Sequence, residues 1–136
     1  MRSVVVSALV LSFGIVAPFA AAPEYRFSVV ASGLNRPVGI ALAGSEDLYF
    51  TEVPNPGVAG AGNRVSHLDL STGEISVLSM GEPEPTNLAV ARNGDVYWTC
   101  KSAGVILRRL EATGAIAPVA TGLDFPSGLS VGRREG

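Results

Sequence analysis

One segment of this chain occurs three times. Each copy opens with a glycine and places a proline four residues later, at residues 33–42, 81–90 and 122–131. The first two copies continue in register, because residues 47–51 read Asp-Leu-Tyr-Phe-Thr and residues 95–99 read Asp-Val-Tyr-Trp-Thr. Repetition of this kind indicates one supersecondary unit copied along the chain.

The period of the repeat limits the folds that are possible. Pro37, Pro85 and Pro126 lie 48 and 41 residues apart, and the difference falls in one loop, residues 53–62. A period of about 40 to 50 residues suits a four-stranded propeller blade or a helical repeat. The stretches between turn signals are short and rich in Val, Ile, Leu, Tyr and Thr, which favours strands joined by tight hairpins. The sequence therefore predicts an all-β fold made of four-stranded antiparallel β-propeller blades.

The predicted strands follow the repeat. In the first blade they cover residues 40–42, 48–52, 64–70 and 75–79. In the second blade they cover residues 88–91, 96–100, 105–110 and 116–120. A further strand at residues 25–31 matches the fourth strand of these blades and is expected to complete the last blade of a ring.

The blades are too few for a ring. The sequence holds the lone fourth strand, two whole blades and the first strand of a third, whereas propellers have about four to eight blades. We interpret the chain as an incomplete ring of about two and a half blades, the N-terminal fragment of a longer propeller. Self-assembly of copies into a ring is the alternative, and the open blade edges favour self-association.

The beginning of the chain differs from the rest. Arg2 precedes a long uncharged stretch that ends in the alanines of residues 20–22. This pattern predicts a secretory signal peptide over residues 1–22, a propeller region over residues 23–136 and a secreted protein. Because Pro23 would follow the cleavage site, the alternative is an uncleaved signal of about 20 residues that anchors the protein in a membrane.

The charge of the chain excludes one class of partner. The chain has 10 basic and 12 acidic residues, and its net charge is −2 at pH 7. This balance gives no electrostatic capture of nucleic acid. We therefore expect no nucleic-acid partner, and a membrane contact only through an uncleaved signal.

Four segments of the first blade resemble known proteins. Residues 37–41, 47–52, 63–65 and 71–75 are similar to the blade pattern of NHL repeats, of the virginiamycin B lyase-like propellers and of the SMP-30/gluconolactonase superfamily. The pattern covers essentially the whole region after the signal. The resemblance implies a propeller, usually one with six blades.

Strand direction predicts where a ligand would bind. In an antiparallel blade, the loop before the first strand and the loop between the second and third strands lie on one rim. We call this the loop rim, and the resemblance implies that it is the functional one and binds a small molecule or a protein. The sequence places there Asn35, Arg36, Glu52, Asn63, Glu82, Glu84, Cys100, Lys101, Asp124 and the loop of residues 53–62.

Glu52 and Asn87 are the candidate metal ligands. The resemblance implies, from related lactone hydrolases, a divalent cation held in the central channel by carboxylate and amide oxygens of several blades. Ca²⁺ takes about six to eight oxygens, so these two residues would supply only part of a site in a full-length ring. Each of the two residues also has a structural interpretation that stays open. For Asn87, it is the replacement of Gly39 and Gly128 at a position of positive φ, which asparagine tolerates. For Glu52, it is a solvated carboxylate at a strand end.

His67 and Cys100 are the only residues of their kinds in the chain. His67 lies on a predicted third strand, which favours an inter-blade or surface position. Because catalysis in the lyase-like family relies on histidines near a metal, the resemblance does not transfer that activity. Cys100 is expected to be buried as a small hydrophobe, or else to form an intermolecular bridge. Aromatic residues at matched positions are expected to pack blade against blade, namely Tyr49, Phe50, Tyr97 and Trp98.

Two classes of function remain. The first, which we prefer, is a binding or scaffold propeller of the NHL/SMP-30-like kind. The alternative is the N-terminal part of a metal-dependent lactone hydrolase, which would be gluconolactonase-like. No catalytic residue is assigned, and the chain by itself is not expected to be an enzyme.

Overall fold

The computed structural model describes residues 24–54 and 63–132. The predicted signal peptide and most of the loop of residues 53–62 lie outside these ranges. Within the described part of the chain, no helix is long and apolar enough to span a membrane.

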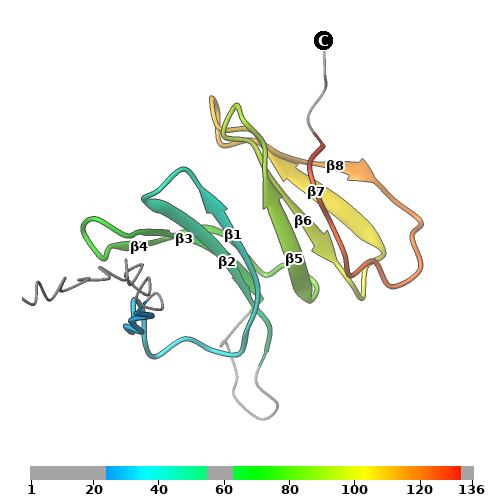
Figure 1. The fold of residues 1–136 in the computed structure, drawn as a ribbon. Coiled ribbons are helices and arrows are strands. Elements are labelled where there is room, and N and C mark those ends of the chain that lie inside the picture. The colour runs from blue at the N-terminus through cyan, green and yellow to red at the C-terminus, as the bar shows by residue number, and fades with distance from the viewer. Residues whose placement is uncertain (1–23, 55–62, 133–136) are drawn as a thin grey trace, which may run out of the picture.

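Eight strands form two four-stranded antiparallel sheets, each a meander in chain order (Figure 1). The first sheet, blade 1, consists of β1 (Pro37–Ala43), β2 (Asp47–Glu52), β3 (Arg64–Asp69) and β4 (Ile75–Met80). The second sheet, blade 2, consists of β5 (Pro85–Val90), β6 (Val96–Cys100), β7 (Val105–Arg109) and β8 (Ile116–Ala120). In Figure 1, β1 and β5 are the edge strands at which the two blades meet, and β4 and β8 are the edge strands farthest from this contact. The predicted all-β fold of propeller blades is confirmed.

The inner strand of each blade begins earlier than predicted. β1 starts at Pro37 and β5 at Pro85, three residues before the predicted starts. A β-bulge follows each proline, between Pro37 and Ile40 in β1 and between Pro85 and Leu88 in β5. Proline has no N–H to donate, so it is tolerated at the first residue of a strand and at bulges. The bulge interrupts the alternation of side chains, and this is why the sequence pattern placed both starts too late.

The predicted strand at residues 25–31 is wrong. These residues form no strand, and Tyr25 and Phe27 are 79% and 96% exposed. A strand needs a neighbour for its N–H and C=O groups, and each blade already has its own fourth strand. The predicted first strand of a third blade, within residues 122–131, is likewise absent from the described structure. The described residues therefore make two complete blades.

The hydrophobic core lies between the two blades. Val65 of blade 1 packs with Leu88, Val96, Trp98 and Cys100 of blade 2, and each of these is at most 3% exposed. Partly buried side chains surround them, namely Ala41, Tyr49, Leu78, Val90, Val105 and Leu107. Burial of one large apolar side chain stabilises a fold by about 1.5 to 3 kcal/mol, so this interface is what holds blade 1 against blade 2.

The aromatic side chains alternate between the faces of their strands. Tyr49 and Trp98 face the other blade, which confirms the predicted blade-to-blade packing for these two. Phe50 and Tyr97, one residue away on the same strands, lie on the outer faces. The outer face of blade 1 also exposes Ile40, of which 68% is accessible to solvent.

Candidate functional site

The strand pairing fixes the two rims of the blades. At one rim β1 pairs with β2 through Pro37 and Glu52, and β5 pairs with β6 through Pro85 and Cys100. Glu52 also pairs with Arg64 at the start of β3. The chain ends of these strands meet at the loop rim, as predicted. The opposite rim carries the short hairpin turns after β1, β3, β5 and β7, and we call it the turn rim.

The loop rim carries a turn whose backbone repeats in all three copies. Gly33, Gly81 and Gly122 have φ values of 71°, 79° and 71°. The residues just before the three prolines, Arg36, Glu84 and Phe125, have φ values of 43°, 55° and 45°. A residue other than glycine at positive φ costs of order 1 kcal/mol or more. Because the same conformation recurs with three unrelated side chains, the turn itself imposes it and the side chain is free to vary.

In both blades a backbone hydrogen bond accompanies this conformation. The Arg36 carbonyl accepts from the Val53 N–H at 3.3 Å, and the Glu84 carbonyl accepts from the Lys101 N–H at 3.0 Å. In each blade the bond ties the loop before the first strand to the residue that follows the second strand. The loop rim is therefore a rigid scaffold that presents one variable side chain per blade.

These variable side chains border a hollow at the loop rim. Its volume is about 370 Å³, and it is lined by Arg36, Val53, Pro54, Asn63, Pro83, Glu84 and Ser102. Asn63 also has a positive φ, of 54°, so three residues with this backbone conformation line one hollow. The Arg36 guanidinium donates to the Pro54 carbonyl at 2.7 Å, which holds this side chain in place.

Glu52 is a buried, paired carboxylate. Its side chain is fully buried, and its two oxygens accept from the Arg64 guanidinium, one of these bonds measuring 3.0 Å. The Asn35 N–H also donates to Glu52 Oε1, at 2.5 Å. The hydrogen bond to Glu52 raises the pKa of Arg64 above its usual value. The interpretation of Glu52 as a solvated carboxylate is therefore wrong: it fastens the loop before β1 to the ends of β2 and β3.

Asn87 lies inside the bulge of β5, and its φ is not positive. Its N–H donates to Thr99 Oγ1 at 3.0 Å. The interpretation of Asn87 as a positive-φ residue is wrong, because the turn puts that conformation on the residue before each proline. Glycine is needed at the matching Gly39 for another reason: a Cβ there would lie 2.1 Å from the Thr86 carbonyl oxygen of blade 2.

The proposed metal ligands do not share a face of the described structure. Thr51 contacts blade 2, so its neighbour Glu52 lies on the outer face of β2, away from Asn87. A cation at Glu52 would have to compete with Arg64 for both oxygens. Among the described residues, no group of three or more His, Cys, Asp or Glu side chains is arranged to hold a metal ion. The assignment of Glu52 and Asn87 as metal ligands stays a prediction for a longer ring.

Cys100 is a free thiol with no exposed surface. It occupies in β6 the position that Glu52 occupies in β2, and its Sγ donates to Glu82 Oε2 at 3.7 Å. Burial, together with the nearby Glu82 carboxylate, raises the pKa of the thiol to about 12. The thiolate is therefore not populated at neutral pH. This confirms the prediction of a small buried hydrophobe.

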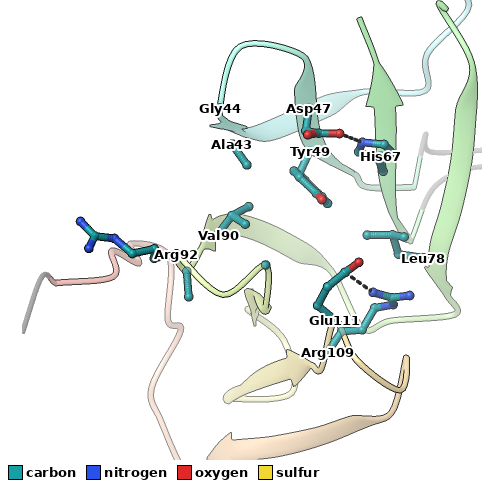
Figure 2. Close-up of a pocket in the computed structure, with 12 residues that line it drawn as sticks. Ala43, Gly44, Asp47, Tyr49, His67, Leu78, Val90, Arg92, Arg109 and Glu111 are labelled. Carbon is teal, nitrogen blue, oxygen red and sulfur yellow. Dashed lines mark hydrogen bonds and ion pairs between the residues drawn. The ribbon is translucent and has the colours of Figure 1, made fainter. Parts of the chain in front are cut away.

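A second hollow lies at the turn rim, between the two blades (Figure 2). Its volume is about 470 Å³, and we call it the turn-rim pocket. It is lined by Ala43, Gly44, Asp47, Tyr49, His67, Leu78, Val90, Ala91, Arg92, Gly94, Arg109 and Glu111. Sequence reasoning assigned no site here, because these residues come from six strands and from the turns of both blades.

The blade 1 wall of this pocket is a triad of side chains. His67 Nε2 lies 2.7 Å from Asp47 Oδ1, and the ring centroids of Tyr49 and His67 are 4.8 Å apart. Burial is the largest cause that raises the pKa of Tyr49, followed by the charges of Asp47 and Glu111. His67 therefore occupies the predicted inter-blade position.

The matching positions of blade 2 repeat the triad. Asp95 Oδ2 lies 3.2 Å from Arg108 Nε, and the Arg108 guanidinium lies 5.9 Å from the centre of the Tyr97 ring. The sequence did contain a signal for this triad. In both blades, Asp and Tyr stand two residues apart at the second strand, and a basic residue lies opposite the Tyr on the third strand. The triad is a repeated structural feature, and what distinguishes the turn-rim pocket is the second wall that blade 2 supplies.

The comparisons with known proteins support the same fold. No protein-family model matches the sequence, and no curated protein matches it significantly. Among solved structures, virginiamycin B lyase from Staphylococcus aureus is 21% identical with a TM-score of 0.54, over 69% of this chain and 30% of that one. A chain of the nidogen/laminin complex is 18% identical with a TM-score of 0.58, over 71% and 35%. Kuenenia stuttgartiensis hydrazine synthase is 16% identical with a TM-score of 0.57, over 80% and 30%.

These likenesses concern the fold alone, because all of the identities are low. The chain spans about a third of the length of the solved structures that it matches. Together with the two meanders and the repeated turn, they show that the chain carries blades of a β-propeller. The predicted β-propeller fold is confirmed at that level.

Proposed function

We propose that this chain is part of a secreted NHL/SMP-30-like β-propeller that binds a ligand at the loop rim, either a small polar molecule or a protein. The observation that carries the proposal is the hollow bordered by Arg36, Asn63 and Glu84, all three at positive φ. A rigid frame that holds exposed loop side chains in fixed positions is typical of binding sites.

The chemistry of the hollow favours a polar ligand. Arg36 and Glu84 place opposite charges on its border, and Asn63 and Ser102 add groups that both donate and accept hydrogen bonds. A ligand with an anionic and a cationic group, such as an amino acid or the end of a peptide, matches this lining. No observation in the described residues favours the lactone hydrolase.

Binding is tested on the mature chain, residues 23–136, by saturation-transfer NMR with amino acids and dipeptides as probes. This measurement observes the ligand, so it tolerates self-association of the protein. We expect saturation transfer to the probes, and we expect Glu84→Gln to weaken it by about fivefold, the equivalent of about one lost hydrogen bond. Glu111→Gln at the turn rim is the matched control and should leave it unchanged. Equal losses in both variants, or no transfer, would contradict the proposal.

Secretion rests on the pattern of residues 1–22. Export with removal of the signal predicts that the mature protein begins at residue 23 and that a chain lacking residues 1–22 stays inside the cell. Mass spectrometry of the protein recovered from the medium measures the new N-terminus. Recovery of the intact chain in the membrane fraction would instead support the anchored alternative.

A further inference from the structure

We propose that the turn-rim pocket binds a neutral polyhydroxylated ligand, such as a mono- or disaccharide (Figure 2). This is a site on the opposite rim from the loop-rim hollow, and it does not depend on ligand binding there. Its volume of about 470 Å³ lies within the range of about 300 to 1,000 Å³ typical of small-molecule sites.

Polar groups enter the pocket from both blades. The Tyr49 hydroxyl of blade 1 and the Glu111 carboxylate of blade 2 point toward each other across the gap (Figure 2). Arg109 NH1 donates to Glu111 Oε2 at 3.2 Å, and the Arg109 side chain is only 21% exposed. Asp47 adds a second carboxylate on the far wall. Carboxylates only accept and guanidinium groups only donate, whereas a hydroxyl does both, so a ligand with several hydroxyls can satisfy all of these groups.

Both carboxylates of the lining already have partners. His67 Nε2 lies 2.7 Å from Asp47 Oδ1, and Arg109 donates to Glu111 at 3.2 Å, whereas Arg92 points away from the pocket (Figure 2). An anionic ligand would approach the two carboxylates, and a cationic ligand would approach the Arg109 guanidinium and compete with it for Glu111. Both would lose hydration without a free opposite charge to replace it. A neutral ligand avoids this cost.

The rest of the lining is apolar or aromatic. Tyr49 and His67 form a tilted aromatic pair with an interplanar angle of 42°. Leu78 and Val90 bring aliphatic groups from blades 1 and 2. The ring of a sugar has C–H groups on its faces and hydroxyls on its edge, so it presents apolar surface to these side chains and polar groups to the carboxylates at once.

The experiment compares three matched sugars on the mature chain by saturation-transfer NMR. The probes are D-galactose, its anionic counterpart D-galacturonate and its cationic counterpart D-galactosamine. We expect a dissociation constant for galactose on the order of 1 to 10 mM, and binding at least about fivefold weaker for the charged sugars. Glu111→Gln should weaken galactose binding by about fivefold or more, because a charged acceptor is lost.

The control is Glu84→Gln at the loop rim, which should leave galactose binding unchanged. Circular dichroism shows whether each variant is folded. If Glu111→Gln does not fold, Arg109→Lys is a second variant that tests the same blade 2 wall of the turn-rim pocket. No transfer to galactose, tighter binding of either charged sugar, or an equal loss in Glu84→Gln would overturn the proposal. Under both proposals, Glu111→Gln leaves the binding of amino acids and dipeptides at the loop rim unchanged. The loop-rim proposal and the turn-rim proposal can therefore fail separately.

Discussion

Thr51 and Thr86 belong to different blades and are joined by a hydrogen bond of 2.7 Å from Thr51 Oγ1 to the Thr86 carbonyl oxygen. The same hydroxyl accepts from the Gly39 N–H, at 2.9 Å, inside the bulge of β1. Thr99 accepts from the Asn87 N–H in the same way in blade 2. One repeated threonine therefore closes the bulge in each blade, and in blade 1 it also fastens the next blade.

Replacement of this threonine by its isostere tests the link between blades. Thr51→Val should lower the free energy of unfolding by about 1 to 3 kcal/mol, because the Gly39 N–H and the Thr86 carbonyl both lose their partner in a buried place. Thr99→Val removes hydrogen bonds within blade 2 alone, to Asn87 and to the Thr86 hydroxyl, and should cost less because no contact between the blades is lost. Urea unfolding followed by tryptophan fluorescence of Trp98 measures both. A larger loss in Thr99→Val would contradict this account.

The close approach of the blades predicts a steric effect at Gly39. A Cβ there would lie 2.1 Å from the Thr86 carbonyl oxygen and 2.9 Å from Thr51 Oγ1. Gly39→Ala should therefore destabilise the protein by about 1 to 3 kcal/mol through overpacking. Gly128→Ala is the matched control from the third copy of the repeat, where no atom lies within 4 Å of the added Cβ. Equal thermal midpoints for the two variants would count against the observed spacing of the blades.

The sequence predicted the architecture because a repeat shows the same unit more than once. Six of the eight strands lie within one residue of their predicted bounds at each end, and the rim assignment followed from strand direction alone. The starts at Pro37 and Pro85 were missed because a bulge changes which face a side chain occupies. The prediction of a strand at residues 25–31 was wrong because the described residues do not contain the strand of the last blade with which it was expected to pair.

The candidate sites were less accessible to sequence reasoning. Glu52 was placed on the correct rim, but its burial depends on Arg64, which lies opposite on the next strand. The turn-rim pocket depends on how blade 2 approaches blade 1, and the spacing of Gly39 against Thr86 that sets this approach has no counterpart in the local pattern. Position along a strand was predictable, whereas contact between blades was not.

Stability in acid should depend on Asp95. Its Oδ1 accepts from the Glu111 N–H at 2.9 Å, and this bond, with further contributions from Asn93 and Arg108, holds the pKa of the carboxyl below its usual 3.8. A lowered pKa means that the ionised form stabilises the fold, so this contribution is present above the usual pKa and is lost as pH falls through the lower one. Asp95→Asn should be less stable at pH 7, with a smaller further loss toward pH 3. The urea unfolding midpoints of the wild type and of Asp95→Asn across this pH range provide the measurement. The same dependence of the midpoint on pH in both proteins would refute the prediction.

The chain of residues 23–136 alone should self-associate. The outer face of blade 1 exposes Val38, Ile40 and Leu42, which are 55%, 68% and 59% accessible to solvent. Leu88, the residue of blade 2 that matches Ile40, is buried between the blades and only 3% exposed. Apolar sheet surface of this kind associates in water. Sedimentation velocity should show species larger than a monomer, reduced by Ile40→Asp but not by Ser45→Asp in the turn after β1. A cooperative thermal transition in a proven monomer would show that the idea is wrong.

The last prediction concerns catalysis and the metal. We expect the chain to hydrolyse no lactone with added Ca²⁺, Mg²⁺, Mn²⁺ or Zn²⁺, because catalysis needs a preorganised set of charges around the reacting atom and a channel site draws them from several blades. Glu52→Gln should nevertheless lower stability by about 1 to 3 kcal/mol without any metal, since Arg64 and the Asn35 N–H lose a charged acceptor. The assay compares the wild-type chain with the double variant Glu52→Gln, Asn87→Ala, and with Glu84→Gln as control. Metal-dependent turnover that disappears only in the double variant would establish Glu52 and Asn87 as ligands and show that Arg64 gives way to a cation.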